Sequence, residues 1–199
     1  MLERLKTYTD ENGLTLNIEK TKVIIFNRSG RHIRRNFYFG NDKIETTRQY
    51  KYLGFLVTPS GEITSGLKDL KDRAHKAFYS MKFKLGHLFR RNPSITIKLF
   101  NALVKPILLY ASDFWGILKL PLNNPVENVH MSFCKQLLGV QKQTTNIGVL
   151  LELGQIPLSI YAKKMAIKNW VRISNRSYCN DLTVMSYENS LSLHLTWLW

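Results

Sequence analysis

One apolar stripe limits the folds that this chain can adopt. It lies in the middle of the sequence, where apolar residues recur at alternating intervals of three and four: Leu67, Leu70, Ala74, Ala77, Met81, Leu85 and Leu88. This spacing places these side chains on one face of a long α-helix. The basic residues of the same segment fall mostly off that face: Lys68, Lys71, Arg73, Lys76, Lys82 and Lys84. The segment therefore predicts a long amphipathic helix with a basic outer surface.

The residues before this helix favour a small β unit. A short helix is expected first, because Leu2, Leu5 and Tyr8 recur at helical spacing. Strand-like runs follow, and Gly40-Asn41 is typical of a hairpin turn between two of them. The expected strands are 23–26, which reads as buried, then 36–39, 43–46 and 50–58. Residues 14–58 thus predict a small antiparallel β unit, which needs more partner surface than it carries.

Helices are expected to make up the chain beyond residue 90. Asn92-Pro93 joins an N-cap residue to a proline at the first helical position. Pro106 should kink the helix that follows, because it removes one backbone donor. Further helices are expected over 126–138, from Thr144 or Thr145 to Gly154, and over 157–173. The polar stretch beyond Ser174 is expected to be poorly ordered. The whole pattern predicts an α+β fold.

Strong positive charge points to a polyanionic partner. The 199 residues include 29 lysines and arginines but 14 acidic residues, which gives a formal net charge of +15. DNA, RNA and an anionic membrane surface fit this charge, as does a basic protein without a specific partner. The most apolar stretch, Leu99–Leu120, contains Lys105, Pro106 and Asp113, so it is a poor membrane span. Nucleic acid is therefore the expected partner, and a membrane is not.

Two features of the sequence indicate the cellular compartment of the protein. The 2 cysteines, Cys134 and Cys179, cannot build a disulfide framework, which fits a reducing, intracellular compartment. The first residues lack the apolar run of a signal peptide. An intracellular protein is therefore expected.

The order of the segments resembles non-LTR (LINE-type) retrotransposon reverse transcriptases. Gly13–Lys22 resembles motif D of that family, where a lysine-threonine pair follows an asparagine. Tyr50–Phe55 resembles motif E, the primer grip. Leu67–Ala77 and Leu103–Gly116 resemble the two thumb helices, and pieces between His130 and Leu158 resemble the segment that follows them. The resemblance extends over about residues 1 to 172.

The resemblance implies the end of a polymerase palm followed by a helical thumb. It assigns residues 1–58 to the palm, 59–118 to the thumb, 119–174 to a C-terminal helical segment and 175–199 to a divergent tail. The fingers, the first palm motifs and the aspartates that hold magnesium in the complete enzyme would lie upstream of Met1. We therefore expect no cofactor and no catalysis from this chain alone. The missing fingers and palm are an expected partner, and a nuclear location is implied.

The same resemblance marks the residues expected to touch nucleic acid. Lys20 would lie near the leaving pyrophosphate in a complete enzyme, as an auxiliary to catalysis; otherwise it is a solvated lysine. The hairpin of motif E would press on the primer backbone, or it is simply packed strand. The lysines of the first thumb helix would contact phosphates of a hybrid or duplex, or they form a solvated face. The full set is Lys20, Lys22, Tyr52, Leu53, Gly54, Lys68, Lys71, Lys76, Lys82 and Lys84.

A second basic cluster indicates nucleic-acid binding less strongly than the lysines of the first thumb helix do. Arg28, Arg31, Arg34 and Arg35 lie in an expected loop. They suit a phosphate site, simple solubility or a nuclear-localisation signal equally well.

Several other patterns are better explained by structure than by chemistry. Tyr110–Asp113 imitates the Tyr-x-Asp-Asp box of polymerases, but it carries one carboxylate within an apolar helical run, so a metal role is not expected. His130 and Cys134 have the i, i+4 spacing of metal ligands, but no second pair follows, and core packing of Cys134 is expected. Trp115 and Trp170 are expected to be core aromatics.

Three functional hypotheses remain open from the sequence. The chain is an incomplete polymerase module that binds primer-template, a non-functional remnant of a mobile element, or a recruited non-catalytic nucleic-acid-binding module. A palm fragment should expose apolar faces of its strands and first helix, so poor solubility is expected for the isolated chain.

Overall fold

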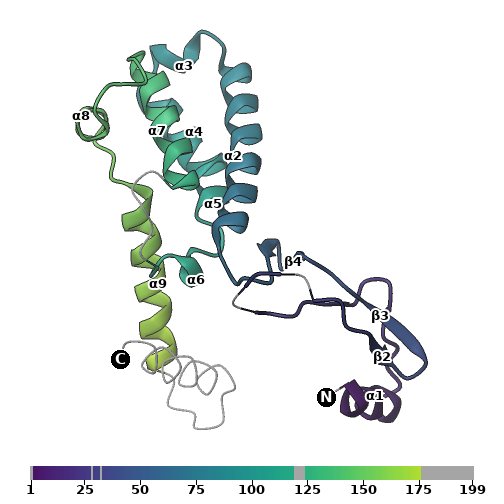
Figure 1. Ribbon diagram of the computed structural model, residues 1–199. Coiled ribbons are helices and arrows are strands. Elements are labelled where there is room, and N and C mark those ends of the chain that lie inside the picture. The colour runs from purple at the N-terminus through teal and green to yellow at the C-terminus, as the bar shows by residue number, and fades with distance from the viewer. Residues whose placement is uncertain (1, 28, 32, 119–123, 176–199) are drawn as a thin grey trace. The chain divides into compact units, whose positions relative to one another are not determined.

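The computed structural model describes residues 2–27, 29–31, 33–118 and 124–175, and it has an α+β fold (Figure 1). Strands occupy the first part of the described chain and helices the remainder, so the expected fold class is confirmed. The chain divides into two compact units, residues 1–73 (unit 1) and 74–199 (unit 2). The boundary falls inside one long helix. No helix in the described segments is long and apolar enough to cross a membrane. The predicted tail, apart from Asn175, lies outside the described residues.

Unit 1 combines one helix with two small sheets and the start of the long helix. The three-stranded sheet has the order β1-β3-β2, with β1 parallel to β3 and β2 antiparallel to it. The predicted hairpin at Gly40-Asn41 is confirmed, because Phe39 pairs with Asp42 across this two-residue turn. The elements are α1 (Leu2–Glu11), β1 (Lys22–Val23), β2 (Phe37–Phe39), β3 (Asp42–Thr46), β4 (Tyr50–Tyr52) and β5 (Phe55–Val57).

Two predicted strands differ from the observed ones. The buried strand over 23–26 is wrong: β1 is two residues long and half-buried, and Phe26 is 61% exposed. β1 is an outer strand that pairs with β3 alone, and its parallel pairing departs from an all-antiparallel unit. The single strand over 50–58 is instead a hairpin, β4 paired with β5. Positive φ angles at Leu53 and Gly54 turn the chain back there.

The long amphipathic helix is confirmed as α2 (Thr64–Leu85). Four members of the predicted stripe are buried, and Phe78, which the stripe omitted, is fully buried with them. The predicted far end is wrong, because Leu88 lies beyond α2 and is 49% exposed. Gly86, with φ of +52°, ends the helix before that residue. The buried members are Leu67, Leu70, Ala74 and Met81.

All the regular elements in the described residues of unit 2 are helices, and several of their ends follow the predicted signals. Asn92 caps α4 by accepting a hydrogen bond from Ile95 N at 3.3 Å. The helix is interrupted at Val104, just before Pro106, as the missing donor requires. Gly139, with φ of +75°, ends α7. The helices are α3 (Leu88–Arg91), α4 (Pro93–Leu103), α5 (Lys105–Leu108), α6 (Ser112–Trp115), α7 (Pro125–Leu138), α8 (Asn146–Glu152) and α9 (Leu158–Ser174).

Aromatic rings hold α2, α4 and α7 side by side (Figure 1). Phe100 and Phe133 stack with ring centroids 3.9 Å apart, and Phe78 meets Phe133 edge to face at 5.9 Å. All three rings are essentially inaccessible to water. Aromatic pairs of this kind add roughly 0.5–1.5 kcal/mol each beyond their buried area. This cluster fixes the part of α2 that belongs to unit 2.

The helix α9 packs closely against α6. A Cβ atom at Gly116 would overlap the backbone of Ala162, so only glycine permits this approach. Trp115 is buried, as predicted, and its Nε1 donates to Tyr110 O at 2.8 Å. The prediction for Trp170 is wrong, because this side chain is 45% exposed, although it lies four residues after buried Ala166 at the edge of the face that α9 buries.

Candidate nucleic-acid interface

The β4–β5 hairpin presents an exposed tip. Its two central residues, Leu53 and Gly54, have φ angles of +46° and +87°. Positive φ at both positions is the signature of a type I′ turn, which matches the twist of paired strands. Tyr52 is 63% exposed and Leu53 is 74% exposed. The motif E-like segment therefore forms a tight turn whose apolar and aromatic side chains face outward.

Three contacts fix this hairpin to the first turns of α2. The ring of Phe55 is buried where Gly66 leaves room for it, because a Cβ atom at Gly66 would overlap the ring. Arg73 Nη2 donates to Gly54 O at 3.0 Å and also contacts Asp69 Oδ2 at 2.9 Å. Lys51 Nζ lies 3.3 Å from the same Asp69 oxygen. The tip of the hairpin is thus held in a defined position on α2 within unit 1.

The lysines of α2 are not equivalent. Lys68, Lys76 and Lys84 are exposed, whereas Lys71 and Lys82 are half-buried. Lys82 Nζ donates to Gln136 Oε1 at 2.6 Å and lies 5.7 Å from the centroid of the Phe89 ring. Lys82 therefore contributes to the packing of unit 2, and the exposed lysines are the better placed for an external phosphate.

Lys20 and Lys22 have different surroundings. The Lys20 side chain is exposed, and its backbone carbonyl accepts a hydrogen bond from Tyr50 Oη at 3.5 Å. The structure thus brings the motif D-like segment beside the motif E-like hairpin. Lys22 donates a hydrogen bond to Glu45 Oε2, and this ammonium holds the pKa of the Glu45 carboxyl below its usual range. A fixed partner makes Lys22 the less available of the two.

The loop that carries Arg31, Arg34 and Arg35 borders a shallow polar hollow of unit 1. Arg34, Arg35 and Lys43 line it together with Asn36, Glu45 and Thr46, and its volume is about 330 Å³. Arg31, Arg34 and Arg35 are exposed. The sequence did not single out Lys43, which reaches this cluster through the pairing of β3 with β2.

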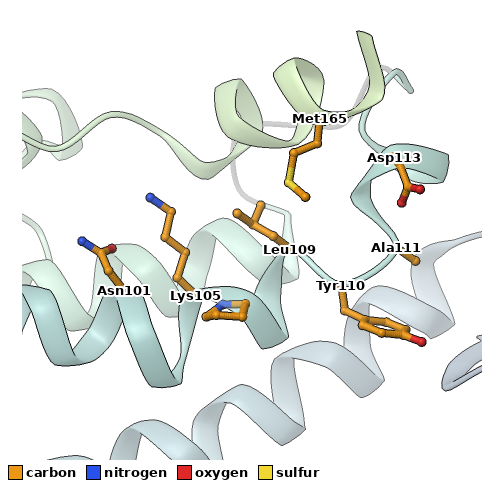
Figure 2. A pocket seen from close by; sticks show the side chains of 8 residues that line it. Asn101, Lys105, Leu109, Tyr110, Ala111, Asp113 and Met165 are labelled. Atoms are coloured by element: carbon orange, nitrogen blue, oxygen red, sulfur yellow. The ribbon is translucent and has the colours of Figure 1, made fainter. Parts of the chain in front are cut away.

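A second hollow, of about 460 Å³, is lined in part by Tyr110, Ala111 and Asp113, the segment that imitates the Tyr-x-Asp-Asp box (Figure 2). Its lining comes from α4, α5, the turn after α5, α6 and α9. In Figure 2, Lys105 and Asn101 lie at one end, Leu109 and Met165 in the middle and Asp113 at the other end. Lys105 Nζ lies 3.2 Å from the centroid of the Tyr161 ring. Among the described residues, no three histidine, cysteine or acidic side chains are grouped to hold a metal ion.

His130 and Cys134 are buried in the core of unit 2, as expected for Cys134. Burial and the charge of Glu127 raise the pKa of Cys134 to about 12. The imidazole of His130 stacks on Phe100 with centroids 5.9 Å apart, and its Nδ1 lies 3.3 Å from Glu127 Oε1. This geometry belongs to packing and not to an open site.

Sequence reasoning missed Glu127. Its carboxylate is buried and accepts hydrogen bonds from Leu158 N at 3.2 Å and Ser159 N at 3.1 Å. These are the first two N–H groups of α9, which have no partner within their own helix. A glutamate three residues after the capping Asn124 is the usual helix-start signal, but it gave no hint that Glu127 reaches a different helix.

Comparisons with known proteins add one informative similarity. The chain is 27% identical over 144 residues to a Caenorhabditis elegans protein described as transposon-derived. The match covers 70% of this chain and 50% of that protein, so the chain spans about half the length of its relative. No protein-family model and no solved structure matches the chain. The similarity supports a mobile-element origin.

Proposed function

We propose that this chain is the end of the palm and the thumb of a non-LTR retrotransposon reverse transcriptase, and that it binds primer-template nucleic acid without polymerising alone. One observation carries the proposal. An exposed hairpin tip in the motif E-like segment is fixed directly to a long basic helix that resembles the first thumb helix. The similarity to a transposon-derived protein agrees with this origin.

The chemistry of binding follows from the exposed lysines of α2. Lys68 and Lys76 are solvated ammonium groups on one continuous helix, so they can meet phosphates without breaking other contacts. Contacts of this kind position a duplex and do not read its sequence. Lys20, Tyr52 and Leu53 would add contacts near the end of the primer. Lys22 and Lys82 would add less, because each is already bound within the fold.

Catalysis is not part of the proposal. The carboxylates of the described residues do not form the grouped set that two magnesium ions require. In a complete enzyme the metal-binding residues would come from a preceding palm, which we propose as the protein partner of unit 1. A nuclear location would follow from the same assignment.

Charge reversal at the exposed α2 lysines tests this function. The variant Lys68→Glu/Lys76→Glu should weaken binding of a labelled RNA–DNA hybrid about tenfold in an anisotropy titration. The matched control, Arg91→Glu/Lys98→Glu, reverses two exposed charges on α3 and α4 and should change the affinity far less. Equal weakening by both variants would show that bulk charge, and not α2, drives binding.

A remnant without a protein function is the second candidate, and the transposon-derived relative favours it equally. Unfolding separates the two. A functional module, including a recruited one, should unfold cooperatively in urea and retain binding up to the transition. A broad, non-cooperative unfolding curve together with an absence of hybrid binding would favour the remnant.

A further inference from the structure

The helix α9 has an outward face that the described residues of unit 2 leave open. Its inner face is anchored by Leu158, Ala162 and Ala166, which are buried. On the opposite side, Ile160, Ile167 and Val171 are 41 to 55% exposed. Trp170 is 45% exposed and lies at the edge of this face, four residues after buried Ala166.

The exposed surface of α9 as a whole is strongly basic. Every charged side chain of α9 is a lysine or an arginine, and all are exposed: Lys163, Lys164, Lys168 and Arg172. Arg172 is oriented by a hydrogen bond from its Nη2 to Asn169 Oδ1 at 2.7 Å. Acidic residues are scarce around it, because the described part of unit 2 contains Asp113, Glu127 and Glu152 alone, and Glu127 is buried. Charge complementarity therefore favours an anionic partner.

The order of side chains around α9 distinguishes between anionic partners. A helix that lies on a lipid surface needs a continuous apolar face with its cations on the polar side. On α9, helical periodicity places Lys163 between Trp170 and Ile167, and Lys164 just beyond Val171. Cations interrupt and border the apolar face, so it suits alternating apolar rings and phosphates better than a lipid bilayer.

We propose that the outward face of α9 binds single-stranded nucleic acid, with Trp170 stacking on a base and Lys163 and Lys164 contacting the adjacent phosphates. Aromatic rings stack on any base, and neighbouring cations follow the backbone, so binding is tolerant of sequence. The proposal for α9 does not involve the α2 lysines, and it does not depend on the reverse-transcriptase assignment.

Tryptophan fluorescence tests the proposal in the full-length chain. Substituting Trp197→Phe and Trp199→Phe leaves buried Trp115 and exposed Trp170 as emitters. Addition of a single-stranded thymidine oligonucleotide should quench the emission, because stacking brings a base against the indole. A further Trp170→Ala change should abolish the quenching and lower the affinity about tenfold in anisotropy of a labelled oligonucleotide. The control Ile147→Ala removes an exposed apolar side chain of α8 and should leave both readouts unchanged.

Other occupants of this face give different results, and each would overturn the proposal. A blue shift with phosphatidylserine vesicles and no quenching by the oligonucleotide would indicate a membrane surface. Concentration-dependent dimerisation that Trp170→Ala abolishes, without oligonucleotide binding, would indicate a second copy of the chain. Failure of this proposal can be distinguished from failure of the proposed function. The variant Lys68→Glu/Lys76→Glu should weaken hybrid binding while the oligonucleotide still quenches Trp170.

Discussion

Glu127 connects two helices of unit 2 through a single side chain. Its carboxylate satisfies the first two N–H groups of α9 and lies beside His130. Substitution Glu127→Ala should lower the free energy of unfolding by about 1–3 kcal/mol, because buried donors lose their acceptor. Urea unfolding measures this loss. Glu152→Ala, at an exposed position on α8, is the control, and an equal loss in both variants would contradict the bridging role.

Cys134 should make the stability of the chain depend on pH in alkaline solution. Burial raises the pKa of its thiol from an ordinary 9.0 to about 12, so the folded state holds the proton more tightly than the unfolded state. The stabilisation is complete below pH 9 and is lost as the pH rises toward 12. Melting temperatures of the chain and of Cys134→Ala, both with Cys179→Ser, should therefore converge over this range. A constant difference would contradict the prediction.

Single aromatic residues show where sequence patterns stop being informative. Trp115 and Trp170 were both expected in the core, yet one is buried and the other is 45% exposed. The close packing of α9 on α6 at Gly116 decides which face of α9 is covered. Phe78 lies on the predicted apolar face, but the predicted stripe passed through its neighbour Ala77 instead.

At the scale of elements, the β4–β5 turn carries a local cost. A leucine with φ of +46° is strained by roughly 1–2 kcal/mol, whereas asparagine tolerates this region. Leu53→Asn should therefore raise the free energy of unfolding by about 1 kcal/mol, as measured in urea. Under the proposed function, it should also weaken hybrid binding, because the exposed apolar tip is lost.

The neighbouring position provides the control for this turn. Tyr52→Asn changes a side chain that is also exposed, 63% against 74% for Leu53, but at a strand position, and it should give no gain in stability. A loss of stability in Leu53→Asn would mean that packing of the leucine outweighs its backbone strain.

Helices were easier to predict than strands because their signals are local. Asn92-Pro93 and Gly139 mark helix ends through contacts within one turn, and both predictions are confirmed. The formation of a strand at 23–26 depended instead on a partner strand, and β3 pairs only with Lys22 and Val23. The hairpin at residues 53–54 needed a leucine in a conformation that sequence patterns disfavour.

The sequence predicted which residues belong to the candidate site, but it did not predict which of them are available to bind phosphate. The sequence indicated which lysines lie off the apolar stripe of α2. It could not show that Lys82 is bound to Gln136, 54 residues away, or that Lys22 is paired with Glu45 across two strands. Such long-range partners arise from the tertiary fold, and they decide which cations remain available.

At the scale of the whole molecule, exposed apolar side chains of unit 1 should promote self-association. Tyr8 and Phe26 are 57% and 61% exposed, and β1 and β2 are outer strands. Sedimentation velocity should detect oligomers of the isolated chain. Tyr8→Lys/Phe26→Lys should reduce them more than Phe83→Lys, which changes an 88% exposed residue of unit 2. A monodisperse, sharply melting monomer would contradict this prediction.

The central claim is that exposed lysines of α2 neutralise phosphates of a bound duplex. The most direct measurement is the affinity for an RNA–DNA hybrid at several salt concentrations, for the chain and for Lys68→Gln/Lys76→Gln. Each phosphate contact contributes about 0.9 to the slope of log affinity against log salt, so the variant should have a slope shallower by roughly 2. Identical slopes for the two proteins, or an affinity of the chain that does not change with salt, would contradict the account.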